Sequence, residues 1–325
     1  MTEATDRAVA GGDGKEPLAQ EYLCHGVYWR GESPRLDLVD IQTVAPVRPL
    51  LLERRVGLRV VSALRWCTGR YGFEGPSGIE HVPCPKQDWV QPGSSQCLEC
   101  TARDEFRFAH QVHRSGAGSA ALRSYLAQPH WVYIATFADG TSKVGTAADV
   151  RKGSRLDEQG PARATYVARA ADGRTARLVE DALTQSLGIA QSKRATAKAA
   201  AWASAVSAQQ IGENHTSIVQ TAIALGRGWR GSRAEYLIEP WQLPPAMDAF
   251  VGAVGSGRCP EYPHDLRQGE HSFWIVAMAG PIALAHLTHE PNAQRFVVNL
   301  GALKGYRLVL GDFSPPPTAH QVSLF

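Results

Sequence analysis

The chain has 325 residues and a formal net charge of +3, with 44% hydrophobic and 20% charged residues. This composition is that of a globular protein long enough to bury a sizeable core, and it excludes a disordered or fibrous chain. No apolar run approaches the ~18 residues that a bilayer-spanning helix needs, and the N-terminus lacks the pattern of a secretory signal. We therefore expect a cytoplasmic protein that does not interact with membranes.

Residues 1–20 are small and polar, which predicts a disordered N-terminus. Short runs rich in β-forming residues follow at 22–29, 35–39 and 57–61, separated by glycine, proline and charged residues. This pattern predicts a small antiparallel sheet.

Four cysteines come next, Cys67, Cys84, Cys97 and Cys100. The last two form a C-x2-C pair, which places two thiolates on one turn, and the distant pair completes four sulfur ligands. In a reducing compartment, clustered cysteines are more often metal ligands than disulfides. The spacing therefore predicts a structural zinc site, with no open position for catalytic water. Either His81 or His110 could replace one cysteine, and four buried thiols without metal are the alternative.

The central stretch reads as a hairpin followed by alternating helices and a strand. Residues 131–137 and 143–145 are rich in β-branched and aromatic residues, and Asp139-Gly140 between them supplies the backbone angles of a tight turn. A helix over 147–158, a third strand over 164–170 and a helix over 175–187 follow. The sequence thus predicts a three-stranded antiparallel sheet with flanking helices.

The motifs of this stretch resemble the GIY-YIG nuclease superfamily. The first strand carries Val132-Tyr133-Ile134 and the second ends in Val144-Gly145, with an arginine and a glutamate on later helices. More narrowly, Lys143-Val144-Gly145-Thr146, Arg155-Leu156-Asp157-Glu158-Gln159-Gly160 and Leu178-Val179-Glu180 resemble the core of the DUF2797 family, whose function is uncharacterised. A cysteine-rich segment before the core agrees with that family.

The resemblance implies a catalytic site formed by Tyr133, Lys143, Arg155 and Glu180. Tyr133 would be the base, Arg155 would clamp the scissile phosphate, and Glu180 would hold Mg²⁺. Lys143 stands where many members have a tyrosine, which moves the expected role of base to Tyr133. Arg151 is the second choice for the phosphate clamp and a predicted substrate-binding residue.

Other interpretations of the same residues remain open. Tyr133 could pack at the sheet, Lys143 and Arg155 could be solvated, and Glu180 could pair with Arg177 on its own helix. The asparagine that many members place after the glutamate helix is absent nearby, and Asn214 is the candidate for its role.

Two further segments are candidate nucleic-acid contacts. Residues 193–212 predict one alanine-rich helix with a basic start, and residues 226–233 interleave glycine and arginine around Trp229. Such an arginine-rich loop can hold phosphates and stack a base, so we predict that Arg230 and Arg233 bind substrate. An ordinary surface loop is the alternative.

Strand-forming runs return at 273–278, 282–287, 296–300 and 306–310, and they resemble the small β module that ends DUF2797 proteins. The predicted fold is α+β. Its predicted parts are a disordered N-terminus (1–20), a β region with the cysteine segment (21–127), a GIY-YIG-like domain with a helical extension (128–255), a C-terminal β module (256–313) and a flexible tail (314–325).

The sequence predicts a metal-dependent, nuclease-like phosphodiesterase acting on DNA or RNA, with structural Zn²⁺ and catalytic Mg²⁺. A nucleic-acid-binding module without chemistry is one alternative. The other is a GIY-YIG-derived enzyme that acts on a nucleic-acid-linked substrate such as aminoacyl-tRNA.

Overall fold

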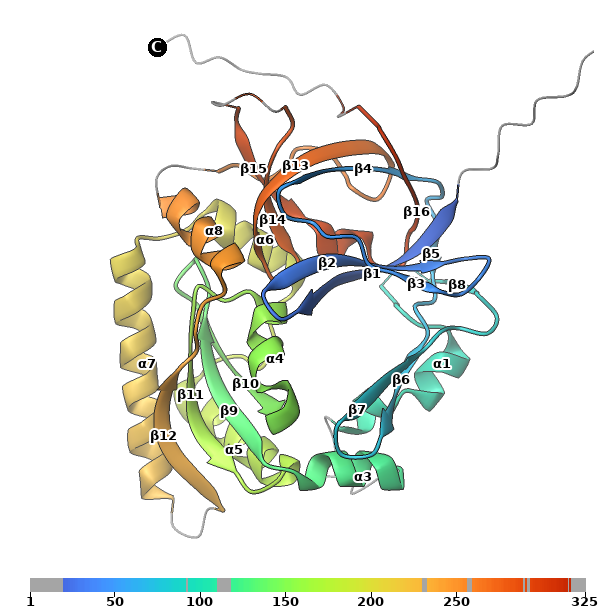
Figure 1. Cartoon of the computed structure of the whole chain (residues 1–325). Coiled ribbons are helices and arrows are strands. Elements are labelled where there is room, and N and C mark those ends of the chain that lie inside the picture. Colours follow the sequence, from blue (N-terminus) through green and yellow to red (C-terminus); the bar gives the residue numbers. More distant parts are fainter. Residues whose placement is uncertain are drawn as a thin grey trace, which may run out of the picture.

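The structure is a computed structural model of the whole chain. It describes residues 20–91, 93–109, 118–229, 233–255, 259–288, 290, 293–314 and 316. The predicted disordered N-terminus and flexible tail therefore lie almost entirely outside the described residues. The described part has an α+β fold built on antiparallel sheets (Figure 1).

The largest sheet has eight strands in the order β15-β14-β13-β4-β16-β1-β2-β3. Its members from the first part of the chain are β1 (Glu21–Arg30), β2 (Ser33–Asp40), β3 (Pro46–Val47) and β4 (Arg54–Val60). Those from the last part are β13 (Gly269–Ala279), β14 (Ile282–His286), β15 (Arg295–Asn299) and β16 (Arg307–Leu310). Because β4 lies between β13 and β16, strands that the sequence analysis placed in two regions form one sheet.

The eight-stranded sheet encloses the largest hydrophobic core. In β2, buried and half-buried residues alternate, as expected of a strand with one face toward a core. Leu38, Leu58, Phe273 and Ile275 are almost completely buried there. Helix α8 (Pro245–Gly255) packs on β13, and Phe250 carries that contact into the core.

The second sheet has the order β10-β9-β11-β12. Its strands are β9 (His130–Thr136), β10 (Ser142–Ala148), β11 (Arg163–Ala170) and β12 (Ala234–Pro240). The predicted turn at Asp139-Gly140 is present, with Gly140 at φ 79° and the Phe137 amide donating to the Thr141 carbonyl at 2.9 Å. The three predicted strands are β9, β10 and β11, and β12 is a fourth strand that the sequence analysis did not predict.

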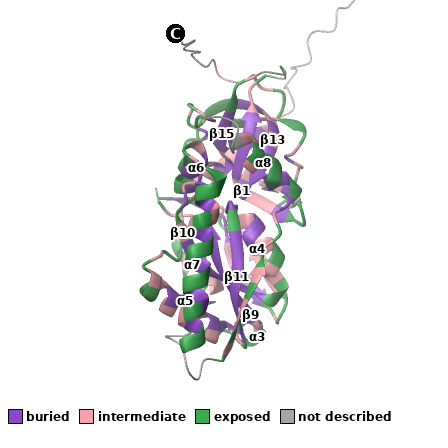
Figure 2. Ribbon diagram, turned by 90° about the vertical axis from the view of Figure 1, so that its left-hand side faces the viewer, coloured by how far each residue is buried: buried purple, intermediate pink, exposed green. Residues whose placement is uncertain are grey.

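Helices cover both faces of this sheet, so every residue of β9 is buried. On one face Leu156 of α4 (Lys152–Gln159) packs against Tyr133 and Tyr166; the 3₁₀ turn η1 (Asp149–Arg151) precedes this helix. On the other face α5 (Gly173–Leu187) and α7 (Ala208–Gly228) pack against Val132 and Ile134. Figure 2 shows the buried strands β9 and β11 between these helices.

The prediction of one continuous helix over 193–212 is wrong. The chain forms α6 (Ala195–Ala203) and then α7, with a break between them. Ser207 begins the second helix, because its side chain accepts the Gln210 amide as an N-cap. The Val206 amide donates to the Ala138 carbonyl at 2.9 Å, which ties the break to the β9–β10 turn.

The cysteine region lies beside both sheets and has little regular structure. Its elements are β5 (Arg65–Trp66), β6 (Arg70–Glu74), β7 (Gly78–Val82), β8 (Trp89–Val90) and α1 (Leu98–Arg103), followed by α3 (Ala120–Ala127). The Phe73 ring stacks on Phe106 and lies tilted against Tyr125 of α3, with ring centroids 4.6 Å apart, and this contact joins the β6–β7 hairpin to α3. A 3₁₀ turn, η2 (Leu300–Leu303), completes the described elements. None of the described helices combines the length and apolar character that crossing a membrane requires.

A buried histidine links α7 to the second sheet and gives the fold a pH dependence. His215 lies 2.8 Å from the Thr136 hydroxyl and 2.8 Å from the Thr165 hydroxyl. Burial, with a smaller effect of Arg163, lowers the pKa of His215 from 6.5 to about 4. Its neutral form therefore stabilises the fold fully above pH 6.5, and this contribution is lost as the pH falls toward 4.

We expect His215→Gln to reduce the loss of stability between pH 7.5 and 4.5, since roughly 3 kcal/mol of that loss comes from protonating this histidine. Urea unfolding of both proteins at the two pH values measures the difference. The histidines His25, His130 and His271 stay in the variant, so their own depressed pKa values cancel in the comparison. If the free energy of unfolding falls by the same amount between the two pH values in both proteins, His215 does not contribute to the pH dependence of stability.

Candidate functional site

The four predicted cysteine ligands come together. The sulfur atoms of Cys67, Cys84, Cys97 and Cys100 all lie within 4.8 Å of one another. Cys67 follows β5, Cys84 follows β7, Cys97 is the N-cap of α1 and Cys100 lies within that helix. Among the described residues this is the one group of cysteines, histidines or carboxylates that could hold a metal ion.

Backbone groups around the sulfurs agree with thiolate ligands. The Cys97 amide donates to the Cys67 sulfur at 3.2 Å. Burial raises the pKa of Cys67 to about 11 and also raises the pKa of Cys100, so a bound cation would have to displace the protons of these two thiols. At Cys84 burial acts in the same direction, but hydrogen bonds with the backbone of Asp88 and Lys86 outweigh it and lower the pKa. His81, the alternative ligand, lies 2.7 Å from the Thr68 carbonyl oxygen instead. His110, the other alternative, lies outside the described residues. The four sulfurs fit a metal ion such as zinc.

A second cluster forms around Tyr133, which is completely buried. Tyr133 lies opposite Gly145 in the β9–β10 pair. A Cβ atom at position 145 would lie 2.5 Å from the Tyr133 hydroxyl, so only glycine leaves room for this ring. Lys143 is on the same face of β10, with its ammonium nitrogen 5.5 Å from the centre of the Tyr133 ring.

Arg155 reaches the same ring from α4. Its guanidinium group lies against the Tyr133 hydroxyl, which has no hydrogen bond of ordinary geometry among the described residues. Burial lowers the pKa of Arg155, but the charges of Tyr133 and Glu158 outweigh that effect and raise it. Glu158 also pairs with Arg151, the second predicted clamp, so both arginines share one carboxylate.

Glu180 belongs to the cluster but is not open. It is 2% exposed, and Arg177 one turn earlier on α5 donates to it at 2.5 Å. Burial raises the pKa of Glu180, and the charges of Arg177 and Lys143 oppose this shift. The pairing with Arg177, which the sequence left as an alternative, is therefore present. Lys143 therefore interacts both with the Tyr133 ring and, through its charge, with Glu180.

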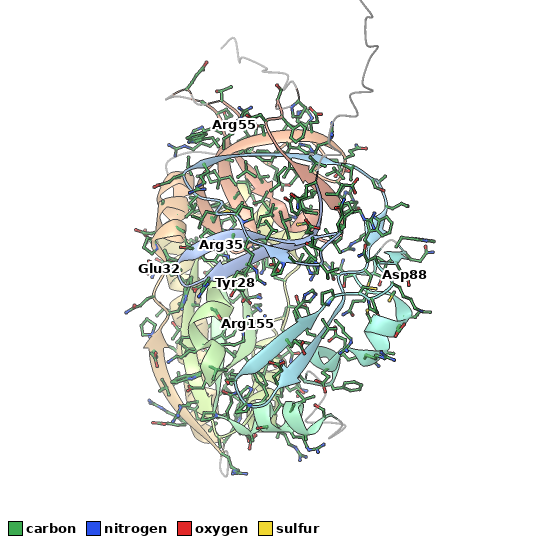
Figure 3. All side chains as sticks on the ribbon, turned by 45° about the vertical axis from the view of Figure 1, so that its right-hand side comes forward. Tyr28, Glu32, Arg35, Arg55, Asp88 and Arg155 are labelled. Carbon is green, nitrogen blue, oxygen red and sulfur yellow. The ribbon has the colours of Figure 1, made fainter. Side chains whose placement is uncertain are left out.

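The accessible end of the cluster is a cleft lined by three arginines, Arg151, Arg155 and Arg177. Its opposite wall carries Phe73 and Phe106 of the cysteine region and Tyr125 of α3. We call it the arginine cleft. Figure 3 labels Arg155 on α4, which lies across from the β6–β7 hairpin. Arg177 and the aromatic wall were not predicted as site residues, because no local pattern in the sequence indicates that the cysteine region packs beside α4 and α5.

Positive charge dominates this part of the molecule. Lys198 of α6 is 5% exposed and donates to the Gln159 carbonyl at 2.7 Å. Burial, followed by the charges of Lys143, Arg155 and Lys193, lowers the pKa of Lys198 to about 7. Burial is the largest cause of this shift, and the three neighbouring cations add to it, so positive charge that can attract an anion gathers here.

The remaining predicted residues that the structure describes do not join the cluster. The Arg233 side chain is 76% exposed and lies 4.0 Å from Asp172, at the start of α5. Arg230 lies outside the described residues. The Asn214 side-chain amide donates to the Gly140 carbonyl at 3.3 Å, so it holds the β9–β10 turn.

Residues 91–226 match the model of a family described as "Protein of unknown function (DUF2797)". The matched stretch includes Cys97 and Cys100, and also Tyr133, Lys143, Arg155 and Glu180. The match supports the resemblance of the chain to that family. No curated protein and no solved structure matches the chain. The family description gives no activity, so the function has to be argued from the sites.

Substitution of Gly145 tests how strictly the cluster is packed. We expect Gly145→Ala to destabilise the protein by about 1–3 kcal/mol, because the new methyl group overlaps the fully buried Tyr133 ring. Gly153 of α4 is the matched control, since a Cβ atom there meets nothing within 4 Å. In a helix, Gly153→Ala should leave stability unchanged or raise it slightly. Urea unfolding measures the stability of both variants. Equal stabilities of Gly145→Ala and Gly153→Ala would contradict the packing of the Tyr133 ring against Gly145.

Proposed function

We propose that the protein is a nuclease-like phosphodiesterase with a GIY-YIG-like core that acts on a nucleic acid. The observation that carries this proposal is the convergence of Tyr133, Lys143 and Arg155, from three separate elements, beside the arginine cleft. A phosphodiester needs positive charge on its oxygens and a group that takes a proton from water. The cluster offers both in the order that the GIY-YIG resemblance implies.

In this mechanism the arginine cleft binds one phosphate of the nucleic acid. Arg155 and Arg177 stabilise the negative charge that develops on the phosphate oxygens when water attacks. Tyr133, acting as a phenolate between Lys143 and Arg155, accepts a proton from that water while the water oxygen bonds to phosphorus. The bond between phosphorus and the departing sugar oxygen breaks, and that oxygen takes up a proton from solvent.

The carboxylates of the cluster do not fit a Mg²⁺ ion as they stand. Glu180, the expected ligand, has a side chain 3% exposed and is held by Arg177 at 2.5 Å. Glu158 is paired with Arg151 and Arg155. Mg²⁺ prefers open carboxylate oxygens together with several waters, so the ion would first have to displace an arginine. No step of the mechanism above therefore passes through a metal ion.

A second candidate is binding of a nucleic acid without chemistry. Two observations favour it. The Tyr133 hydroxyl is shielded from solvent, and the Glu180 carboxylate is already neutralised by Arg177. The same cations would then serve only to hold the phosphate backbone.

Tyr133→Phe separates the two candidates. Because the Tyr133 hydroxyl has no hydrogen bond of ordinary geometry, its removal should leave folding and nucleic-acid binding unchanged. We expect cleavage of plasmid, single-stranded DNA or tRNA to fall by about 10²-fold or more in this variant. Arg155→Gln should weaken both binding and cleavage, whereas Arg54→Gln, an exposed arginine of β4, is the control for general charge.

Each assay is run with Mg²⁺ and with EDTA, at two salt concentrations. Cleavage that survives in Tyr133→Phe would refute the role of the tyrosine. Salt-sensitive binding that Arg155→Gln weakens, with no product from the wild type, would favour the binding module.

For the cysteine site we propose a structural zinc ion. Four sulfurs complete a tetrahedron and leave no position for water, so the ion would stabilise the fold rather than take part in catalysis. The cysteine region has little regular structure of its own, which makes it dependent on such a link.

We expect about one equivalent of zinc in the purified protein by elemental analysis, and its loss together with lower thermal stability in Cys100→Ser. Cys259→Ser is the matched control, because Cys259 is also buried but lies outside the cluster. A zinc content below about half an equivalent would contradict the proposal.

A further inference from the structure

We propose that the hydroxyl groups of Tyr125 and Thr146 bind the phosphate that enters the arginine cleft, and that the cleft selects a single strand over a duplex. Both residues line the cleft, Tyr125 on α3 and Thr146 on β10, and each is 8% exposed. Because this names the substrate class of the arginine cleft, it rests on the proposed function.

Both hydroxyl groups are available to a ligand. Neither forms a hydrogen bond within the described part of the chain. The Tyr133 hydroxyl is shielded from solvent, whereas the hydroxyls of Tyr125 and Thr146 are not. A ligand that displaces water from the cleft must therefore accept hydrogen bonds from both hydroxyls, because a donor left unpaired at this depth costs free energy.

The Tyr125 hydroxyl faces the positive wall of the cleft. Burial raises the pKa of Tyr125, and the charges of the three arginines of the cleft oppose this shift without cancelling it. The phenol therefore keeps its proton at neutral pH and acts as a hydrogen-bond donor. An anion in the cleft meets guanidinium groups on one side and this donor on the other. Within a nucleic acid, the phosphate is the group whose charge and oxygen atoms match these donors.

Contacts on three sides fix the position of Tyr125. The Gln128 side-chain amide donates to the Tyr125 carbonyl at 2.9 Å and to the Pro76 carbonyl, in the β6–β7 turn, at 2.5 Å. The Tyr125 ring lies 4.6 Å from the Phe73 ring and 6.0 Å from the His130 ring, measured between centroids. The wall that carries the hydroxyl is therefore formed before a phosphate binds, which reduces the entropic cost of binding.

The cleft is too narrow for a duplex. Its volume is ≈ 60 Å³, far below the roughly 300–1,000 Å³ of sites that enclose whole small molecules. Its walls belong to α4 and α5 on one side and to the β6–β7 hairpin and α3 on the other (Figure 1). A duplex is stiff over roughly 150 base pairs and carries its phosphates on the outside of a wide body, so it cannot pass between these walls. A single strand is thinner and flexible, so one of its phosphates can enter.

The test compares binding of labelled single-stranded DNA and RNA with binding of the blunt-ended duplex of each sequence, measured by fluorescence anisotropy on the full-length protein. Inorganic phosphate is titrated as a third ligand. We expect at least one single strand to bind about tenfold or more tightly than its duplex. Tyr125→Phe and Thr146→Val each remove a hydroxyl and keep the shape of the side chain, so each should weaken binding of that single strand about tenfold.

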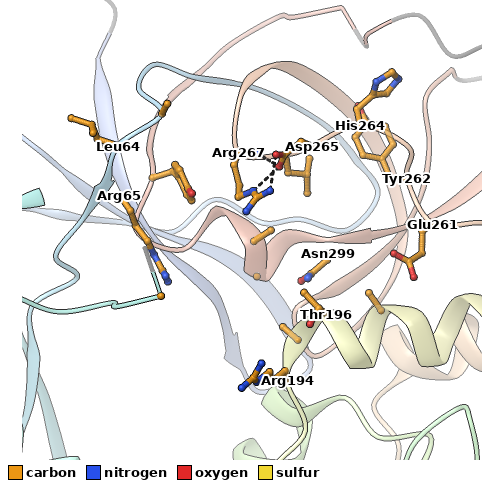
Figure 4. A pocket seen from close by; sticks show the side chains of 18 of the residues that line it. Leu64, Arg65, Arg194, Thr196, Glu261, Tyr262, His264, Asp265, Arg267 and Asn299 are labelled. Carbon is orange, nitrogen blue, oxygen red and sulfur yellow. Dashed lines mark hydrogen bonds and ion pairs between the residues drawn. The ribbon is translucent and has the colours of Figure 1, made fainter. Parts of the chain in front are cut away.

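Tyr306→Phe is the matched control, because it also removes one tyrosine hydroxyl. Tyr306 lines a separate cavity of ≈ 760 Å³ (Figure 4), which shares no residue with the arginine cleft. This variant should bind the single strand like the wild type. Urea unfolding checks that all three variants keep the stability of the wild type.

The proposal is overturned if the duplex binds as tightly as the single strand, or if Tyr125→Phe and Thr146→Val bind the single strand like the wild type. If Arg155→Gln weakens binding and these two variants do not, the proposed function stands and only the role of the hydroxyls fails. If no nucleic acid binds, but the two variants weaken binding of inorganic phosphate, the proposed function fails and the single strand is excluded as the ligand.

Discussion

The candidate catalytic cluster depends on one close approach, that of the Tyr133 ring to the backbone of Gly145. Antiparallel register places the two residues opposite each other, and the missing side chain at position 145 leaves the space that the ring occupies. The ring in turn fixes where Lys143 and Arg155 meet, because one lies over its face and the other against its hydroxyl. A glycine in a strand interior normally weakens the strand, so its cost has to be offset by this packing.

Charge compensation is the second constraint on the cluster. Lys143 is 4% exposed and Glu180 is 2% exposed, and a buried charge is costly without a partner of opposite charge. Their mutual attraction, together with Arg177, holds these charges inside the fold. The cations of this cluster outnumber its carboxylates. The arginine cleft therefore presents a net positive charge to solvent or to a ligand.

Much of the central region could be predicted from local signals in the sequence. The Asp139-Gly140 turn, strands β9, β10 and β11 and the cysteine cluster each follow from residue type and spacing over a few positions. Features set by distant parts of the chain could not. Strand β4 pairs with β13 across more than two hundred residues, and no short pattern specifies that partner. Arg177 was identified only as a pairing alternative for Glu180, because nothing local shows that it also faces aromatic residues of the cysteine region.

One segment of the chain, residues 190–198, connects the Tyr133 cluster, the hairpin turn and the eight-stranded sheet. The Ala190 carbonyl accepts the Val144 amide at 3.0 Å, which closes the open edge of β10 beside Lys143. Lys193 pairs with Asp139 at the hairpin turn, and Lys198 donates to the end of α4. Because Lys198 belongs to α6, and α6 packs on β14 and β15 of the eight-stranded sheet, this segment fixes the position of the Tyr133 cluster relative to that sheet.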